Sequence, residues 1–340
     1  MRYRTFGTSG LRVSELFLGA MTFGESWGWG SPIEECRKVL EVYREAGGNV
    51  IDTANKYTNG ESERIVGELL SGQRDQLVVA TKYTLSIDGA DPNASGNHRK
   101  SLRTSLEQSL RRLNTDYVDL LWVHVWDPHT PIHETMRALD DAVAAGKVLY
   151  VGVSDTPAWA ISRANTMAEL RGWSPFVAAQ LPYSLAQRDI ERELLPMAEE
   201  LGLSVAAWSP LARGLLTGKF TQHTATEPTR IDPAQISERD LTIARALDAV
   251  AAELGATPSQ VALAWIMARK PFIHPILGSR SVSQLTDNLA AAELRLPADA
   301  MRRLDDASAI PLGFPLEFFE ATREFAYGPV VHQFDSRRPG

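Results

Sequence analysis

The sequence predicts a single (β/α)8 barrel (TIM barrel) of the α/β class, with an N-terminal β-hairpin and an extra C-terminal helix and tail. Short runs rich in β-forming residues alternate with longer stretches whose apolar residues recur every three or four positions. This alternation produces parallel strands joined by right-handed crossovers. Eight such pairs favour a closed barrel over an open sheet, and 340 residues suit one barrel domain.

The elements follow one another in a regular order. The predicted strands are residues 16–20, 49–52, 77–81, 118–124, 148–154, 176–180, 204–208 and 274–277. The predicted helices are residues 32–45, 62–70, 99–113, 132–145, 157–170, 190–201, 239–270 and 282–291. Several strands are apolar on successive residues, as in Leu77-Val78-Val79-Ala80. This pattern is typical of strands that are buried on both faces.

The predicted domain covers residues 1–340. It consists of a hairpin at 3–14, the barrel at 16–291 and a C-terminal helix and tail at 297–340. Gly7-Thr8-Ser9-Gly10 is a turn signature, and its hairpin could close one barrel end. Three segments lack the repeat: 24–30, 217–235 and 311–340. Long segments of this kind are often functional loops.

Composition excludes several classes of function. The chain has 35 Lys and Arg against 42 Asp and Glu, a net charge of −7, so a nucleic-acid partner is not expected. A single cysteine, Cys36, cannot form an intramolecular disulfide or a thiolate metal cluster. No metal site is predicted. No run resembles a signal peptide or a membrane span, and we expect a cytoplasmic protein without a membrane partner.

Ionisable side chains stand at the ends of three consecutive predicted strands. Asp52 ends the second strand and Tyr57 follows five residues later; Lys82 follows the third strand, and His124 ends the fourth. In barrels of this kind the active site lies at the carboxyl ends of the strands. Each residue alone could be a turn former, a solvated charge or a packing residue. Their joint position on one rim favours an active site.

The segments around these residues resemble the aldo-keto reductases, over nearly the whole chain. Residues 51–57 (IDTANKY) with 60–63 (GESE) look like the first signature of the family, and 119–124 (DLLWVH) with 146–154 (GKVLYVGVS) look like the second. Residues 208–219 (WSPLARGLLTGK) and 275–280 (PILGSR) are similar to a bacterial branch that includes the potassium-channel beta subunits. The resemblance implies reduction of an aldehyde or ketone to an alcohol, with a catalytic tetrad of Asp52, Tyr57, Lys82 and His124.

The chemistry of these residue types agrees with that tetrad. A free tyrosine, with a pKa of about 10, is a poor proton donor at neutral pH. The ammonium group of Lys82 would lower the pKa of Tyr57, and Asp52 would hold Lys82 charged and oriented. His124 would donate a hydrogen bond to the carbonyl oxygen of the substrate.

The resemblance also implies a nicotinamide cofactor, because no side chain supplies a hydride. The nicotinamide end would contact Ser154, Asp155, Gln180 and Trp208, and the pyrophosphate Ser209, Leu211, Arg213 and Lys219. The adenosine end would contact Gly278, Ser279, Arg280, Gln284 and Asn288. Arg280 would hold a ribose 2′-phosphate, which favours NADP(H) over NAD(H). Gly278 and Gln284 stand where better-known members carry Lys and Arg, so NAD(H) stays open.

The expected substrate pocket is mostly aromatic, as small-molecule pockets tend to be. Its predicted walls are Met21, Phe23, Trp27, Trp29, Tyr83 and Trp126, with Phe314, Phe318 and Phe319 from the C-terminal segment. Such walls suit a carbonyl compound with an apolar or a sugar face. A regulatory subunit that binds NADP(H) with little turnover is the main alternative, against which the complete tetrad argues. A barrel hydrolase is disfavoured because no His-x-His ends the first strand and no glutamates end the fourth and seventh.

Overall fold

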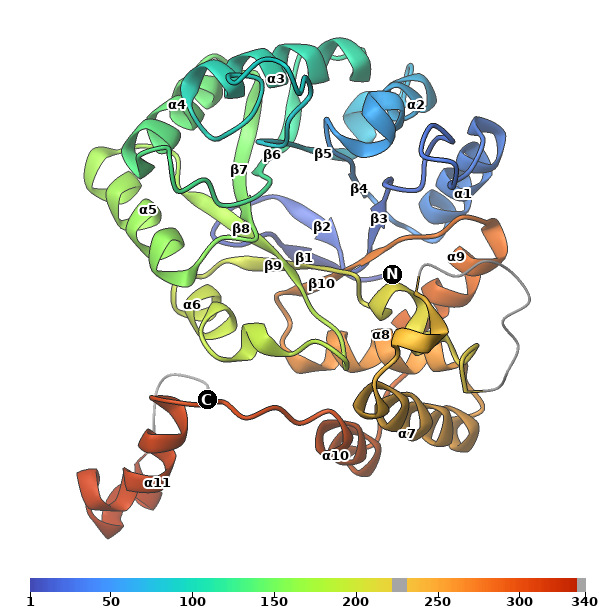
Figure 1. Ribbon diagram of the computed structural model, residues 1–340, viewed down its shortest axis with the longest axis vertical. Coiled ribbons are helices and arrows are strands. Elements are labelled where there is room, and N and C mark those ends of the chain that lie inside the picture. Colours follow the sequence, from blue (N-terminus) through green and yellow to red (C-terminus); the bar gives the residue numbers. More distant parts are fainter. Residues whose placement is uncertain (222–230, 335–340) are drawn as a thin grey trace.

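The computed structural model describes residues 1–221 and 231–334 and confirms the predicted barrel. Within this part of the chain, eight parallel strands close on themselves in the order β10-β3-β4-β5-β6-β7-β8-β9 (Figure 1). Their bounds are Phe17–Gly19 (β3), Val50–Asp52 (β4), Val78–Tyr83 (β5), Val118–Val123 (β6), Val148–Ser154 (β7), Phe176–Pro182 (β8), Ser204–Trp208 (β9) and Ile273–Leu277 (β10). Strands β3 to β6 are buried along their whole length, as their apolar sequences predict.

Helices surround the strands (Figure 1). The α-helices of the described residues are Ile33–Glu45 (α1), Glu61–Leu69 (α2), Arg99–Leu113 (α3), Ile132–Ala144 (α4), Ala158–Arg171 (α5), Leu194–Glu200 (α6), Glu238–Leu254 (α7), Pro258–Arg269 (α8), Val282–Leu289 (α9), Ala298–Ala307 (α10) and Leu316–Tyr327 (α11). Each of the first nine lies within or close to a predicted helix.

The predicted N-terminal hairpin is present and closes the end of the barrel where the strands begin. Strands β1 (Tyr3–Thr5) and β2 (Arg12–Ser14) pair antiparallel. In the turn between them, the Gly7 N–H donates to Ser204 Oγ at 2.8 Å, at the start of β9. Gly7 has φ +58, and a Cβ there would lie 1.9 Å from the Val177 carbonyl oxygen, so no other residue fits. The hairpin thus plugs the barrel.

His274 of β10 is fully buried beneath this plug. Its ring stacks on Phe17 with ring centroids 5.0 Å apart and contacts the edge of Phe6 at 5.9 Å. Burial lowers the pKa of His274 to about 4, against a weaker opposing effect of the Ser14 carbonyl. His274 therefore stays neutral in the folded protein at pH values where the unfolded chain already binds a proton.

We expect this histidine to make folding stability depend on pH. As pH falls from about 6.5 to 4, the unfolded state gains the proton first, so the free energy of unfolding should fall by roughly 3 kcal/mol because of His274. His274→Phe should remove that part of the slope. Urea unfolding of both proteins across this range measures it, with the exposed His133→Gln as control. Equal slopes in wild type and His274→Phe would contradict the assignment.

Two predicted helices differ from the structure. The single helix expected over 239–270 is wrong. The helix α7 ends at Leu254 and is followed by Gly255, which has φ 61; α8 begins after Thr257, whose side chain forms a capping box with Gln260. The helix expected over 190–201 begins only at Leu194, after a short 3-10 helix at Asp189–Glu191. Pro196 explains this start, because proline is tolerated in the first turn of a helix but not in its interior.

The C-terminal segment is more helical than expected. Residues 311–340 lack a clear apolar period, yet Leu316–Tyr327 form α11. This helix stands away from the barrel (Figure 1), and its side chains include no buried one. Phe314, Phe318 and Phe319 are all exposed. The structure therefore does not bring these three rings to the barrel rim, and their expected place in the substrate pocket is wrong for this arrangement.

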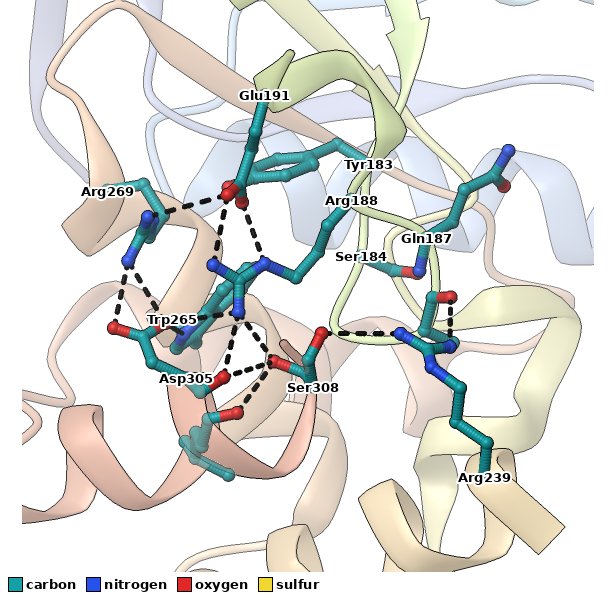
Figure 2. A network of polar contacts seen from close by, with 12 residues as sticks. Tyr183, Ser184, Gln187, Arg188, Glu191, Arg239, Trp265, Arg269, Asp305 and Ser308 are labelled. Carbon is teal, nitrogen blue, oxygen red and sulfur yellow. Dashed lines mark hydrogen bonds and ion pairs between the residues drawn. The ribbon is translucent and has the colours of Figure 1, made fainter. Parts of the chain in front are cut away.

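A polar network fixes α10 to the barrel (Figure 2). Arg188, which follows β8, donates to Glu191 at 2.9 Å and to Ser308 at 2.8 Å, while Asp305 of α10 accepts from Trp265 and Arg269 of α8 at 3.0 and 2.9 Å. These groups are mostly shielded from water, where such pairs are costly to break. The network explains why the chain is held against the barrel as far as residue 308.

Candidate active site

The four predicted catalytic residues lie together on the rim formed by the carboxyl ends of the strands. Asp52 is the last residue of β4, Lys82 is the next-to-last residue of β5, and His124 directly follows β6. Tyr57 begins a 3-10 helix, Tyr57–Gly60, between β4 and α2. Because neighbouring parallel strands end at the same edge, residues 30 and more positions apart meet here.

Lys82 and Asp52 form a buried ion pair at the centre of this cluster. Lys82 Nζ lies 2.5 Å from Asp52 Oδ2 and donates to the Thr53 carbonyl oxygen at 2.8 Å. The second oxygen of Asp52 accepts from Trp122 Nε1 at 3.0 Å and from Gln180 Nε2 at 2.9 Å. Both Asp52 oxygens are thus satisfied, as a buried carboxylate requires.

Trp122 was not predicted as a site residue, although its partner Asp52 was. It lies in the barrel interior, fully buried, and the adjacent Gly152 has no room for a Cβ, which would lie 2.4 Å from its ring. A sequence signal existed, because a tryptophan buried inside a barrel needs an acceptor for its N–H. The pattern of the chain alone does not reveal that this acceptor is Asp52.

Tyr57 stands beside the lysine. Lys82 Nζ lies 4.6 Å from the centre of the Tyr57 ring, and the edge of the His124 ring meets the Tyr57 ring with centroids 5.9 Å apart. Trp27 contacts the Tyr57 ring at 6.4 Å from another direction. The phenol is therefore enclosed by an ammonium group, an imidazole and an indole.

Burial and charge act on these groups in opposite directions. Burial raises the pKa of Tyr57 above its ordinary value, and the charge of Lys82 counteracts only part of that rise. Burial also disfavours the charged form of Lys82, but Asp52 and then Tyr57 more than offset it, so the pKa of Lys82 is raised. Around neutral pH the site therefore holds a protonated phenol next to an ammonium group. The expected lowering of the Tyr57 pKa by Lys82 is present but is outweighed by burial.

His124 is neutral at physiological pH. Burial, followed by the charge of Lys82, lowers its pKa to about 3. Its Nδ1 atom is buried without a hydrogen-bond partner in the structure. A neutral imidazole carries one N–H donor, so His124 can donate a single hydrogen bond to a group that enters the site.

The residues expected near a nicotinamide lie on the next strands of the same rim. Ser154 ends β7, Gln180 lies on β8 and Trp208 ends β9. Trp208 Nε1 donates to Asp155 Oδ1 at 3.0 Å, and burial raises the pKa of Asp155. The Gln180 amide already donates to Asp52, so a contact with a nicotinamide would use its other N–H or its oxygen.

The segment after β9 has an unusual backbone. Ser209, Ala212 and Arg213 have φ values of 54, 47 and 56, in the left-handed region, and Gly214 has φ 96. Non-glycine residues in this region are strained and occur preferentially at ligand-binding sites. Lys219 Nζ lies over Gly214, 2.8 Å from the position of an added Cβ. Leu211, Arg213 and Lys219 therefore share one tight loop; the predicted polar segment 217–235 lies partly outside the described residues.

The residues expected at the adenosine end of the cofactor lie just before α9 and within it. The side chain of Ser281 caps this helix, and the Gln284 side chain accepts from the Arg280 N–H at 2.9 Å. Ser279 is buried, Asn288 lies 3.5 Å from its hydroxyl, and Gly278 has open space around it. The Arg280 side chain is exposed next to a helix N-terminus, where anions are favoured.

Comparison with known proteins identifies the family. The model of the aldo/keto reductase family matches residues 15–309. The chain belongs to the aldo/keto reductase family. Among curated proteins, a norsolorinic acid reductase of Aspergillus flavus is 40% identical over 94% of this chain and 84% of its own length. An aryl-alcohol dehydrogenase [NADP(+)] of Phanerodontia chrysosporium is 39% identical over 91% and 86%.

These relatives correct one expectation and support another. The predicted similarity to a bacterial branch is not borne out, because these relatives come from fungi. The same holds for a putative aryl-alcohol dehydrogenase of Saccharomyces cerevisiae, which is 36% identical over 91% of this chain and 86% of its own length. Membership of the aldo/keto reductase family, and relatives named as reductases and dehydrogenases, support an oxidoreductase that acts on carbonyl compounds.

The side chains expected to line the substrate pocket divide into two groups. Phe23 and Tyr83 are buried in the main hydrophobic core, whereas Met21, Trp27, Trp29 and Trp126 are only partly buried. Trp27 and Trp29 contact each other with centroids 5.7 Å apart. The ring of Trp126 contacts the exposed ring of Trp159, with centroids 5.6 Å apart. The sequence did not indicate Trp159 as a site residue, because it lies in α5 rather than at a strand end.

Among residues 1–221 and 231–334, none of the helices has the length and apolar character of a membrane span. No group of three or more His, Cys, Asp or Glu residues in the same part of the chain could hold a metal ion.

Proposed function

We propose that this protein is an NADP(H)-dependent reductase of aldehydes or ketones in which Tyr57 is the general acid. The observation that carries the proposal is the buried Lys82, which touches Asp52 on one side and the Tyr57 ring on the other, with His124 against the same ring. In this arrangement a phenol, an ammonium group and a neutral imidazole lie together, and they would serve as proton donor, fixed positive charge and hydrogen-bond donor.

In reduction, negative charge develops on the carbonyl oxygen of the substrate. Tyr57 would donate its proton to that oxygen, and the adjacent ammonium of Lys82 would stabilise the resulting phenolate. The neutral His124 would donate a hydrogen bond to the same oxygen and polarise the carbonyl. Asp52 would act through Lys82, because it keeps the ammonium charged in a buried position.

The rim residues fit a nicotinamide dinucleotide. When bound, NADPH supplies the hydride that no side chain can provide. Trp208 would offer an aromatic face, and Ser154, Asp155 and Gln180 polar groups, to the nicotinamide. The left-handed loop with Ser209, Leu211, Arg213 and Lys219 would hold the pyrophosphate. Gly278, Ser279, Arg280, Gln284 and Asn288 would hold the adenosine end.

We propose an aromatic carbonyl compound as the substrate class. The rim beside Tyr57 carries the partly buried indoles of Trp27 and Trp29. Flat aromatic side chains favour flat ligands through stacking and edge contacts. The name of one relative, the aryl-alcohol dehydrogenase [NADP(+)] of Phanerodontia chrysosporium, agrees with this class.

Arg280 should set the preference for NADP(H). Arg280→Ala should weaken NADPH binding by about tenfold to a hundredfold, because a charge-assisted hydrogen bond to the 2′-phosphate is lost, and should leave NADH binding little changed. Fluorescence titration with both cofactors measures the two dissociation constants. The exposed Arg302→Ala is a matched control. Equal losses for NADPH and NADH would show that Arg280 does not read the 2′-phosphate.

A steady-state assay tests the proposed function. Purified protein with NADPH and an aromatic aldehyde should consume NADPH at a rate that depends on the aldehyde. NADPH that binds but is not consumed with any member of a panel of aromatic and aliphatic carbonyl compounds would reject the proposal. That result would instead favour the cofactor-binding regulatory protein.

A further inference from the structure

Residues 22–31, which we name the rim loop, contact both the segment that carries Tyr57 and the segment that precedes α9. This loop carries Trp27 and Trp29 and follows β3. At its ends, Thr22 Oγ1 donates to the Ser279 carbonyl oxygen at 2.9 Å, and Ser31 Oγ donates to the Arg280 carbonyl oxygen at 2.8 Å. The Ser31 N–H also donates to the Thr22 carbonyl oxygen at 2.9 Å. Both ends of the rim loop are therefore fixed beside the segment that precedes α9.

The middle of the rim loop is held by one carboxylate from a different element. Glu61, the first residue of α2, accepts the N–H of Glu25 at 3.1 Å and that of Ser26 at 3.0 Å through the same Oε2 atom. Gly24 has φ +101, and a Cβ there would lie 2.6 Å from Glu61 Cδ. The Glu61 carboxylate therefore contacts the loop backbone directly, and only a glycine at position 24 allows this approach.

The rim loop also contacts residues 57–60, the segment that carries Tyr57. Ser26 Oγ donates to the Thr58 carbonyl oxygen at 2.7 Å, and Thr58 Oγ1 donates to the Phe23 carbonyl oxygen at 2.9 Å. Thr58 and Asn59 have φ values of 44 and 54, in the left-handed region. Such a backbone persists only where its surroundings enforce it. The rim loop and residues 57–60 therefore hold each other in position.

We propose that Glu61 is a positioning residue that determines substrate specificity. It fixes the rim loop so that the Trp27 ring stands against Tyr57, and so creates a wall that favours flat aromatic carbonyl compounds over small aliphatic ones. This inference rests on the proposed function. It assigns to Glu61 no contact with the substrate or the cofactor. Its influence passes through the backbone of Glu25 and Ser26 to the Trp27 side chain.

The test compares an aromatic aldehyde, benzaldehyde, with a small aliphatic one, propanal. Glu61→Ala should raise KM for benzaldehyde and lower its kcat/KM by about tenfold, because two charge-assisted hydrogen bonds to the loop are lost. The kcat/KM for propanal, kcat for both aldehydes and the affinity for NADPH should change little. Glu25→Ala is the matched control, because only the backbone of Glu25 takes part in the contact.

Two further variants separate positioning from general damage. Gly24→Ala crowds the same carboxylate and strains the loop backbone at φ +101 while the charge of Glu61 stays in place, and it should reproduce the loss of preference. In a Trp27→Ala background, Glu61→Ala should change the benzaldehyde-to-propanal ratio by less than about twofold, because residues that act as one unit are not additive. A structural role alone would instead give additive losses with both aldehydes.

The two proposals fail in different ways. Wild-type protein that consumes no NADPH with either aldehyde rejects the proposed function, and this inference with it. Wild-type turnover with an unchanged aldehyde ratio in Glu61→Ala rejects the inference alone. An equal loss of kcat for both aldehydes in Glu61→Ala also rejects it, since that result would make Glu61 a general support of the site.

Discussion

Tyr57→Phe should lower kcat for carbonyl reduction by about 10²- to 10⁴-fold, the usual contribution of a general acid. The substitution removes one oxygen and keeps the ring that lies against Lys82, His124 and Trp27. The fold and the affinity for NADPH should therefore be preserved. Steady-state kinetics with an aromatic aldehyde measure kcat, and fluorescence titration measures NADPH binding.

A tyrosine outside the site provides the comparison for this variant. The Tyr117 hydroxyl donates to Asp75 at 2.8 Å on the outer surface, and Tyr117→Phe should retain the wild-type kcat. If Tyr57→Phe keeps most of the wild-type turnover, Tyr57 is not the proton donor. The acid would then have to be another group on the rim.

Lys82→Met should reduce kcat by a comparable factor for a different reason. Burial already raises the pKa of Tyr57, and the ammonium group is the main effect that opposes this rise. Without it, the phenolate left after proton donation would have no neighbouring positive charge. The variant also leaves Asp52 as a buried carboxylate without its cation, which should cost about 3–5 kcal/mol in the free energy of unfolding.

A double variant separates the chemistry from this loss of stability. Lys82→Met combined with Asp52→Asn removes both charges, and an asparagine oxygen can still accept from Trp122 and Gln180. We expect much of the stability to return, by urea unfolding, while kcat stays low. Recovery of turnover in the double variant would show that Lys82 serves only to neutralise Asp52. Lys147→Met, which removes a surface pair with Glu107, is the control.

The barrel was predictable because its signals are local and repeat along the chain. Alternating apolar runs gave the strands β3 to β10, and the Gly7 to Gly10 turn gave the hairpin. The boundary between α7 and α8, which was not predicted, also has local signals: Gly255 and the capping residues Thr257 and Gln260. The continuous apolar period over 239–270 concealed it, since periodicity alone does not mark where a helix ends.

Only the part of the site that lies at the strand ends could be predicted from the sequence. Because each strand end is placed by the barrel, Asp52, Lys82 and His124 had to share a rim. Contacts between distant elements carry no such pattern. The bond from Trp122 to Asp52, the use of Gln180 by the same carboxylate, and the seat of Glu61 on Gly24 depend on three-dimensional packing. The helix α11 likewise lacks an apolar period because none of its side chains is buried.

The central claim, hydride transfer to a carbonyl carbon at this rim, is tested most directly with labelled cofactor. The protein would be incubated with benzaldehyde and NADPH that carries deuterium at both C4 positions of the nicotinamide, and the alcohol product analysed by mass spectrometry and NMR. We predict one deuterium on the carbinol carbon for each labelled NADPH consumed, and little product with Tyr57→Phe. NADPH bound without formation of alcohol, or alcohol formed without deuterium from either face of the nicotinamide, would contradict the account.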